Sequence, residues 1–191
     1  MNLIYSESPK EHWKYLNCEN EVVIDFGCAY NDIDAEKTRE NKLGTPHYII
    51  SQNPKQYIGI DIYEPDLIEL QNEFPDSTFI NDSIDSSDKL QKLFDTYQPT
   101  IIKSDIEGAE IQFVNTRPPN SLKSIAIETH GADIETEFIE WAESFGFKIK
   151  DIEALAEHPH IKIIYFYSQR HIDAELMGCN SCLFILKTDR E

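Results

Sequence analysis

Short apolar runs rich in β-branched residues alternate along the chain with segments in which apolar side chains recur at helical spacing. The strand-like runs cover residues 22–26, 57–62, 78–80, 100–104, 124–128, 147–150, 162–167 and 182–186. Helical spacing is clear for Leu67, Leu70 and Phe74, and Pro75 then ends the helical segment. Such alternation is typical of parallel strands joined by crossover helices. The pattern predicts an α/β fold with a doubly wound sheet, helices on both faces, and antiparallel edge strands in the last third.

The ends of the helical segments and the length of the chain indicate its organisation. Ser8, Pro9 and Glu11 form a capping box with proline at the first helical position, so residues 1–20 are expected to hold an N-terminal helix. Residues 31–56 are polar and only weakly helical, and they are expected to form either a lid over a ligand or a solvated surface excursion. The 191 residues suit a single domain, 1–191.

The charge balance narrows the expected partners. The chain has 17 Lys and Arg against 35 Asp and Glu, a formal net charge of -18. Such a charge repels phosphate backbones and anionic lipid, although a local basic groove is compatible with it. We therefore expect a small-molecule acceptor and neither nucleic acid nor membrane as a partner. No run approaches the ~18 apolar residues of a membrane span, and residues 1–14 lack the apolar core of a signal peptide, so a cytoplasmic protein is expected.

Four cysteines are present: Cys18, Cys28, Cys179 and Cys182. In a cytoplasmic chain they are expected to be free thiols. Cys179 and Cys182 have the spacing of a zinc knuckle or a redox pair. A zinc site also needs a second pair of ligands, and no such pair is evident in the sequence.

The residues that follow each strand carry the candidate chemistry, because ligands of an open parallel sheet bind beyond the carboxyl ends of its strands. Gly27 follows the first strand, where glycine allows a sharp turn and a close approach to a ligand. Its loop lacks the G-x-G-x-x-G pattern, which argues against a nicotinamide-dependent oxidoreductase. Asp61 and Glu64 follow the second strand and can accept hydrogen bonds from both hydroxyls of a ribose, Asp61 being the first choice. The alternative is that one of them caps the helix opened by Pro65.

Two polar residues follow the third strand. The carboxylate of Asp82 can accept a hydrogen bond from an adenine amino group, with Ser83 or Ile84 adding a backbone contact. The alternative is that Asp82 only stabilises a turn in its own backbone.

The fourth strand ends in three carboxylates within six residues: Asp105, Glu107 and Glu110. They repel one another unless a cation, a proton or hydrogen bonds offset the charge, so this cluster is the strongest functional signal in the chain. In the alternative interpretation Glu110 lies on an exposed helix face and Glu107 caps a turn.

His130 ends the fifth strand and is a candidate general base, because the ordinary pKa of histidine lies near neutrality. Four further histidines are expected at the surface or in loops: His12, His47, His158 and His160.

Residues 102–110, Ile-Lys-Ser-Asp-Ile-Glu-Gly-Ala-Glu, resemble the K-I-D-V-E-G-A-E stretch of the FkbM-like family of class I S-adenosylmethionine-dependent methyltransferases. Residues 127–130 resemble that family's following strand, and residues 178–185 its closing strand. The resemblance implies a Rossmann-like sheet of seven mostly parallel strands with an antiparallel last strand. It places S-adenosylmethionine over Gly27, Asp61 and Asp82, with Asp25 supporting the first loop. The remaining expected cofactor residues are Cys28, Glu64, Ser83 and Ser104.

The resemblance also implies an activity. The methyl group would face Asp105, Glu107 and His130, and the acceptor would be a hydroxyl oxygen of a sugar, polyketide or other small metabolite. The same three side chains could hold Mg²⁺ against two substrate oxygens. Because a fold does not fix a function, the alternative is a non-catalytic protein that binds S-adenosylmethionine or a nucleotide.

Overall fold

The computed structural model describes residues 2–4, 8–29, 44–156 and 158–170. Its strands are β1 (Asn2–Ile4), β2 (Val22–Phe26), β3 (Gln56–Asp61), β4 (Thr78–Asn81), β5 (Ile101–Ser104), β6 (Ser124–His130), β7 (Phe147–Leu155) and β8 (Ile161–Ser168). The helices are α1 (Pro9–His12), α3 (Thr45–Ile50), α4 (Glu64–Glu73), α5 (Ser87–Tyr97), the 3-10 helix η1 (Ala109–Asn115) and α6 (Ala132–Ser144).

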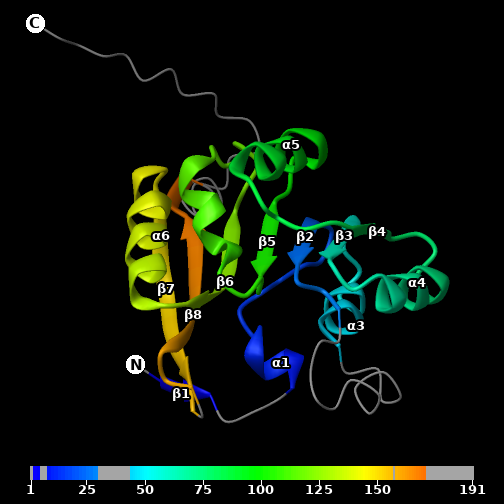
Figure 1. The fold of residues 1–191 in the computed structure, drawn as a ribbon, viewed down its shortest axis with the longest axis horizontal. Coiled ribbons are helices and arrows are strands. Elements are labelled where there is room, and N and C mark those ends of the chain that lie inside the picture. The colour runs from blue at the N-terminus through cyan, green and yellow to red at the C-terminus, as the bar shows by residue number, and fades with distance from the viewer. Residues whose placement is uncertain (1, 5–7, 30–43, 157, 171–191) are drawn as a thin grey trace, which may run out of the picture.

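One sheet holds all eight strands in the order β1-β7-β8-β6-β5-β2-β3-β4 (Figure 1). Strands β4, β3, β2, β5 and β6 run parallel, and β8 runs antiparallel to both β6 and β7. This confirms the doubly wound, seven-stranded, mostly parallel sheet with an antiparallel last strand. The chain order reverses between β2 and β5, and in such sheets this reversal is the position where ligands bind.

The edge of the sheet differs from the prediction in two ways. A short additional strand, β1, pairs in parallel with β7 and extends the sheet to eight strands. The predicted strand at 147–150 continues to Leu155, with a register shift between Ile149 and Asp151. The strand predicted at 182–186 lies outside the described residues.

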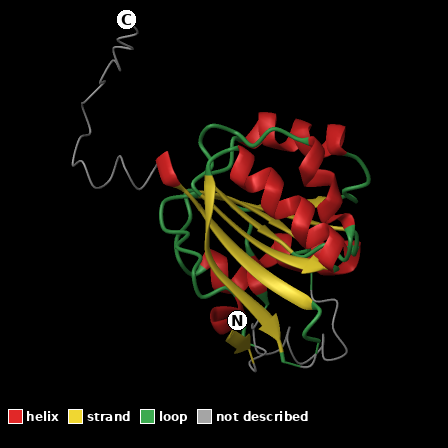
Figure 2. Cartoon of the chain, turned by 90° about the vertical axis from the view of Figure 1, so that its left-hand side faces the viewer, coloured by secondary structure: helices red, strands yellow, loops and turns green. Residues whose placement is uncertain are grey.

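Helices cover both faces of the sheet, as predicted (Figures 1 and 2). On one face Phe26 and Ile127 pack against Phe113 of η1 and Phe138 of α6. On the other face the packing partners come from the N-terminal segment and α3: Val23, Tyr57 and Ile101 contact a cluster containing Trp13, Leu16 and Ile49. The alternation of side chains along a strand separates these two clusters, so successive residues of each strand belong to different layers.

Other expectations are met only in part. The N-terminal helix predicted within 1–20 is the single turn α1, and Trp13 already leaves helical geometry. Residues 44–56 of the segment 31–56 contain α3, but residues 30–43 lie outside the described residues, so its role stays a prediction. Cys18 and Cys28 are buried free thiols, whereas Cys179 and Cys182 lie outside the described residues. Among the described residues, no helix is long and apolar enough to cross a membrane.

Candidate functional site

The carboxyl ends of four parallel strands are joined by backbone hydrogen bonds. The N–H groups of Gly27, Asp82 and Asp105 donate to the carbonyls of Ile60, Asp61 and Phe26 at 2.9, 3.0 and 3.0 Å. The structure therefore brings the predicted residues after β2, β3, β4 and β5 to one edge of the sheet. His130 ends the adjacent strand β6 at the same edge.

Gly27 lies at the reversal of strand order, and its backbone conformation admits no other residue easily. Its φ is +72°, and a Cβ atom built on it would lie 1.7 Å from the carbonyl oxygen of Asp105. The absent side chain therefore allows the loop after β2 to contact the end of β5 directly.

The buried side chain of Lys103 connects the Gly27 loop to Asp25 of β2. Its Nζ lies 2.9 Å from Oδ1 of Asp25 and donates to the carbonyl oxygen of Gly27 at 2.7 Å. The hydroxyl of Tyr57 donates to the other oxygen of Asp25 at 2.7 Å, and all three side chains are buried. Burial lowers the pKa of Lys103, but the charges of Asp25 and Asp105 outweigh it and raise the pKa above the ordinary value. Asp25 thus supports the first loop through a lysine ammonium.

Asp61 joins the loop after β2 to the start of α4. It accepts the N–H of Ala29 at Oδ2 and the N–H of Tyr63 at Oδ1, each at 2.9 Å. A carboxylate has about four lone-pair sites, so both oxygens keep acceptor capacity for ribose hydroxyls. Glu64, the second choice for the ribose, is the first residue of α4 and is exposed.

Asp82 is exposed and forms ion pairs and hydrogen bonds with its neighbours. Its Oδ1 accepts from the N–H of Ser83 at 2.9 Å and from Nζ of Lys89 at 2.9 Å. The hydrogen bond from Lys89 lowers the pKa of Asp82 below the ordinary value, so the group is ionised at neutral pH. The hydrogen bond from the N–H of Ser83 is the local contact expected if Asp82 only stabilises a turn in its own backbone. The carboxylate also lies at the edge of the sheet where the cofactor was expected, so both interpretations of Asp82 stay open.

Two further expected cofactor residues are buried. The Cys28 side chain packs under the loop, because a Cβ atom on Gly59 would approach its Sγ to 2.8 Å. Cys28 as a whole is only 1% exposed, so its thiol is not open to a ligand at this edge. The hydroxyl of Ser104 is buried without a hydrogen-bond partner.

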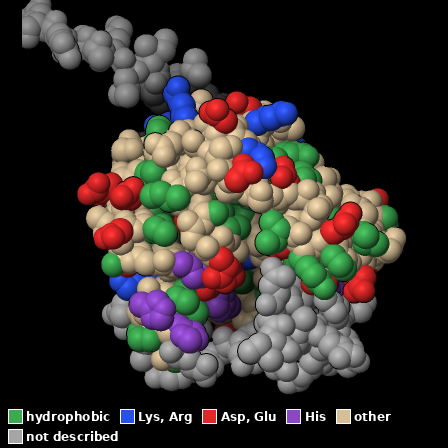
Figure 3. Space-filling model, viewed as in Figure 1, with side chains coloured by type: hydrophobic (Ala, Val, Ile, Leu, Met, Phe, Trp, Pro, Cys, Tyr) green, Lys and Arg blue, Asp and Glu red, His purple; other side chains and the backbone are tan. Residues whose placement is uncertain are grey.

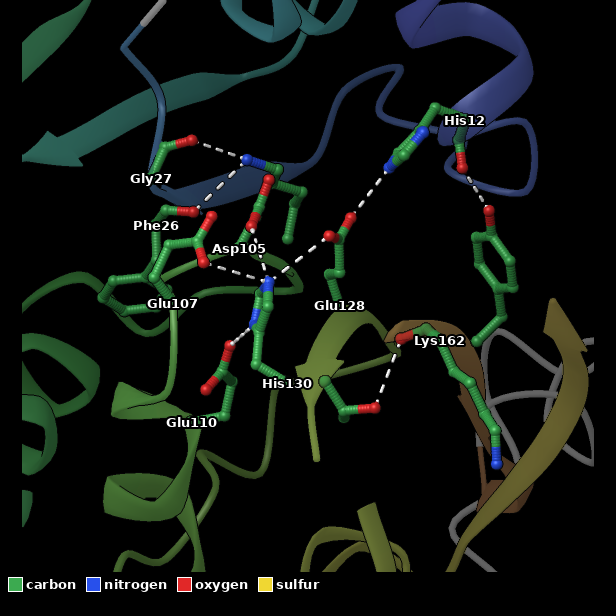
Figure 4. A network of polar contacts seen from close by, with 12 residues as sticks. His12, Phe26, Gly27, Asp105, Glu107, Glu110, Glu128, His130 and Lys162 are labelled. Atoms are coloured by element: carbon green, nitrogen blue, oxygen red, sulfur yellow. Dashed lines mark hydrogen bonds and ion pairs between the residues drawn. The ribbon is translucent and has the colours of Figure 1, made fainter. Parts of the chain in front are cut away.

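His130 is the centre of a polar cluster at the ends of β5 and β6 (Figure 4). Its Nδ1 lies 2.6 Å from Oε1 of Glu110. Its Nε2 lies 3.4 Å from Glu128, 3.4 Å from Glu107 and 4.0 Å from Asp105. The space-filling view shows histidine side chains beside acidic side chains at one end of the molecule (Figure 3).

The burial of the carboxylates decides between the two interpretations of the acidic motif. Glu110 is fully buried, so its predicted alternative position on an exposed helix face is wrong. The Glu107 side chain is 83% exposed, although it reaches His130. Glu107 and Gly108 have φ values of +52° and +96°, and this left-handed pair turns the chain from β5 into η1. For Glu107 such a backbone is strained, which is common beside functional sites.

Three groups of the cluster have shifted pKa values. The hydrogen bonds to Glu110 and Glu128 raise the pKa of His130 to about 10. Burial raises the pKa of Asp105 to about 6. Burial also disfavours ionised Glu128, but hydrogen bonds with His12 and His130 outweigh it and lower the pKa to about 2. His130 is therefore an imidazolium at neutral pH, and it must lose its Nε2 proton before it can act as the predicted base.

Sequence reasoning missed three residues of this edge. Lys103 and Glu128 each precede a predicted site residue by two positions, Asp105 and His130 respectively, and therefore lie on the same face of the strand. That spacing was the available signal. His12 was expected at the surface, but its side chain is only 20% exposed and its Nε2 lies 2.9 Å from Oε2 of Glu128. No pattern within the sequence connects it with a position 116 residues away.

No protein-family model and no curated protein matches this sequence. Solved structures do match its fold. A proposed tRNA methyltransferase from Streptococcus pneumoniae, in complex with S-adenosyl-L-methionine, has a TM-score of 0.58 at 10% identity, over 86% of this chain and 73% of that chain. A precorrin-6y C5,15-methyltransferase from Geobacter metallireducens has a TM-score of 0.54 at 15% identity, over 87% and 90%. The fibrillarin pre-rRNA processing protein of Methanococcus jannaschii has a TM-score of 0.53 at 12% identity, over 80% and 69%.

These similarities identify the fold as the Rossmann-like one of class I S-adenosylmethionine-dependent methyltransferases. They also correct the expectation that nucleic acid is excluded as a partner. Two of the similar proteins are described by tRNA methylation and pre-rRNA processing. A net charge of -18 therefore does not exclude nucleic acid for a chain of this fold, because the local field at a site, and not the total charge, meets the substrate.

Proposed function

We propose that this chain is an S-adenosylmethionine-dependent methyltransferase whose cofactor lies along the edge formed by Gly27, Asp61, Asp82 and Asp105. The observation that carries the proposal is the contact of the Gly27 loop with the end of β5 at the reversal of strand order. This is the position where open α/β sheets bind nucleotide-like ligands. The shared fold of a chain that holds S-adenosyl-L-methionine supports the choice of cofactor.

Each part of the cofactor has a matching group. The free acceptor positions of Asp61 suit the two ribose hydroxyls. Asp82 and Ser83 suit the adenine, whose amino group donates to a carboxylate. The Gly27 turn, fixed by Lys103, allows the backbone to approach the amino-acid portion closely.

The acceptor group in this proposal is a hydroxyl oxygen, which the resemblance of residues 102–110 to FkbM-like enzymes supports. When bound, S-adenosylmethionine would supply an electrophilic methyl group for this oxygen and would leave as S-adenosylhomocysteine. The protein mainly aligns the oxygen behind the methyl group. The hydroxyl proton passes to a carboxylate of the cluster, Asp105 or Glu107, or to His130 once its imidazolium has lost the Nε2 proton.

Calorimetry with S-adenosylmethionine and S-adenosylhomocysteine tests the binding step. We expect the wild-type chain to bind both, Asp61→Asn to bind at least tenfold more weakly, and the exposed control Asp76→Asn to bind like the wild type. Absence of heat with both ligands would overturn the proposal.

Transfer is tested by release of S-adenosylhomocysteine with a panel of hydroxyl acceptors. The panel includes sugars, polyketides and RNA, because a ribose hydroxyl is the same type of nucleophile. We expect turnover with one acceptor class and its loss in Asp105→Asn. Cofactor binding without turnover on any acceptor would instead favour the non-catalytic alternative.

A further inference from the structure

Three side chains at the ends of β5 and β6 direct potential metal ligands toward a common point. One ligand atom from each of Asp105, Glu128 and His130 lies within 4.8 Å of the others. Nε2 of His130 is 3.4 Å from Oε1 of Glu128 and 4.0 Å from Oδ1 of Asp105. Ligand atoms around a tetrahedral ion bound at about 2.0–2.1 Å lie roughly 3.3–3.5 Å apart, so the pair of His130 and Glu128 already fits and Asp105 must move closer to them.

The histidine is already oriented as a metal ligand. The N–H group at Nδ1 of His130 donates to Oε1 of Glu110 at 2.6 Å. This contact fixes the ring with Nε2 directed toward the carboxylates of Asp105 and Glu128. Nε2 is buried, and the nearest oxygens of Glu128 and Glu107 each lie 3.4 Å from it. Histidines that bind metals almost always donate their other ring N–H to a carboxylate or carbonyl in this way. Glu110, fully buried in η1, supplies that outer partner.

Glu128 is oriented in the same manner from the opposite side of the cluster. Its Oε2 lies 2.9 Å from Nε2 of His12, which leaves Oε1 on the side of His130. The hydroxyl of Tyr165 donates to the carbonyl oxygen of His12 and fixes that residue against β8. Two of the three potential ligands therefore have dedicated orienting partners.

The charge of the cluster favours a cation. Four carboxylates surround His130: Asp105, Glu107, Glu110 and Glu128. The nearest buried ammonium, that of Lys103, is already engaged by Asp25 and by the backbone of Gly27. A divalent cation at the common point offsets charges that otherwise repel one another.

We propose that Asp105, Glu128 and His130 bind a divalent transition-metal ion such as Mn²⁺ or Zn²⁺, and that the ion displaces the Nε2 proton of His130. Two carboxylates with one imidazole form a borderline ligand set, whereas Mg²⁺ prefers oxygen ligands and retained water. The set differs from the one expected from sequence, because the exposed Glu107 is replaced by the buried Glu128. The proposal concerns binding of the metal alone, so it does not depend on the proposed methyl transfer.

The test uses the full chain stripped with a chelator and titrated with MnCl₂ in the absence of S-adenosylmethionine. Loss of the free Mn²⁺ signal in electron paramagnetic resonance measures the bound ion. Mn²⁺ is chosen because it binds thiolates weakly, which keeps Cys179 and Cys182 out of the measurement. We expect one bound Mn²⁺ ion per chain in the wild type. We also expect Mg²⁺ to bind this site more weakly than Mn²⁺, so that MgCl₂ displaces the bound Mn²⁺ only at a large excess.

Variants distinguish this site from other acidic groups. Glu128→Gln and His130→Gln each remove a metal ligand and should weaken Mn²⁺ binding at least 100-fold. Glu110→Gln keeps all three ligands and changes only the hydrogen-bond partner of His130, so it should weaken binding about 10–100-fold. Glu140→Gln, a change of an exposed carboxylate on α6, is the matched control and should bind within about twofold of the wild type. Circular dichroism confirms that each variant is folded. Absence of bound Mn²⁺ in the wild type, or equal affinity in Glu128→Gln, would overturn the proposal.

Discussion

The carboxylate of Glu110 and the imidazole of His130 lie 2.6 Å apart, Oε1 to Nδ1, and this contact joins η1 to the end of β6. Glu110 is fully buried, so its charge has no water to stabilise it. The imidazolium of His130 stabilises this charge in place of water. The contact also fixes the ring with Nε2 toward Asp105, Glu107 and Glu128. The acidic motif after β5 therefore contributes one partner of an internal ion pair, Glu110, and one potential metal ligand, Asp105.

The first prediction concerns this pair in the metal-free protein. The hydrogen bond to Glu110 raises the folded-state pKa of His130 to about 10, from an ordinary value of about 6.5. This stabilisation is complete below pH 6.5 and is lost as the pH rises toward 10. Glu110→Gln should lower the His130 pKa by at least one unit in an NMR titration. The free energy of unfolding should also fall less between pH 7 and 10 than in the wild type.

The matched control for this titration is Glu140→Gln, a change of an exposed carboxylate on α6. It should leave the His130 titration unchanged. A His130 pKa near 6.5 in the wild-type protein would contradict the ion pair.

The second prediction concerns the turn after β2. Gly27→Ala combines a positive φ with a Cβ atom 1.7 Å from the carbonyl oxygen of Asp105. We expect a loss of about 3 kcal/mol or more in the free energy of unfolding, measured by urea denaturation. Gly146→Ala has a φ of +84° but no atom within 4 Å of the added Cβ, so it should cost only about 1 kcal/mol. Equal losses would show that the backbone contact does not hold the turn.

The third prediction concerns the buried pair of Lys103 and Asp25. Lys103→Met leaves the buried carboxylate of Asp25 without its counter-ion, with only the Tyr57 hydroxyl as a donor, and it should destabilise the fold by about 3–5 kcal/mol. The control is Lys123→Met, which removes an ion pair with Glu21 in which the lysine is 41% exposed. That change should cost about 1 kcal/mol or less. Urea denaturation of both variants under the same conditions measures the two losses in the free energy of unfolding. Similar losses would contradict a stabilising role of the Lys103–Asp25 pair under the Gly27 loop.

Local sequence signals were sufficient for the sheet and for grouping most residues of the candidate site at one edge. Apolar runs identified the parallel strands, and the carboxyl ends of parallel strands meet at one edge, so Gly27, Asp61, Asp82 and Asp105 could be grouped without a structure. The three-residue strand β1 was not predictable, because a strand of that length has no periodicity of its own.

Contacts between distant segments set the rest of the site. The burial of Glu110 depends on η1 packing beneath β6, and the role of His12 depends on a fold that brings it to Glu128. The choice of Glu128 over Glu107 as a potential ligand depends on which carboxylate the turn at Gly108 leaves exposed. These are tertiary effects, and residue type and spacing alone do not determine them.

A crystal structure of the chain with S-adenosylhomocysteine is the most direct test of the central claim that the strand edge at Gly27 is a cofactor pocket. The account predicts ribose hydroxyls within hydrogen-bond distance of the Asp61 carboxylate, with the adenine beside Asp82. Ligand density elsewhere on the molecule, or none at a saturating concentration, would contradict it.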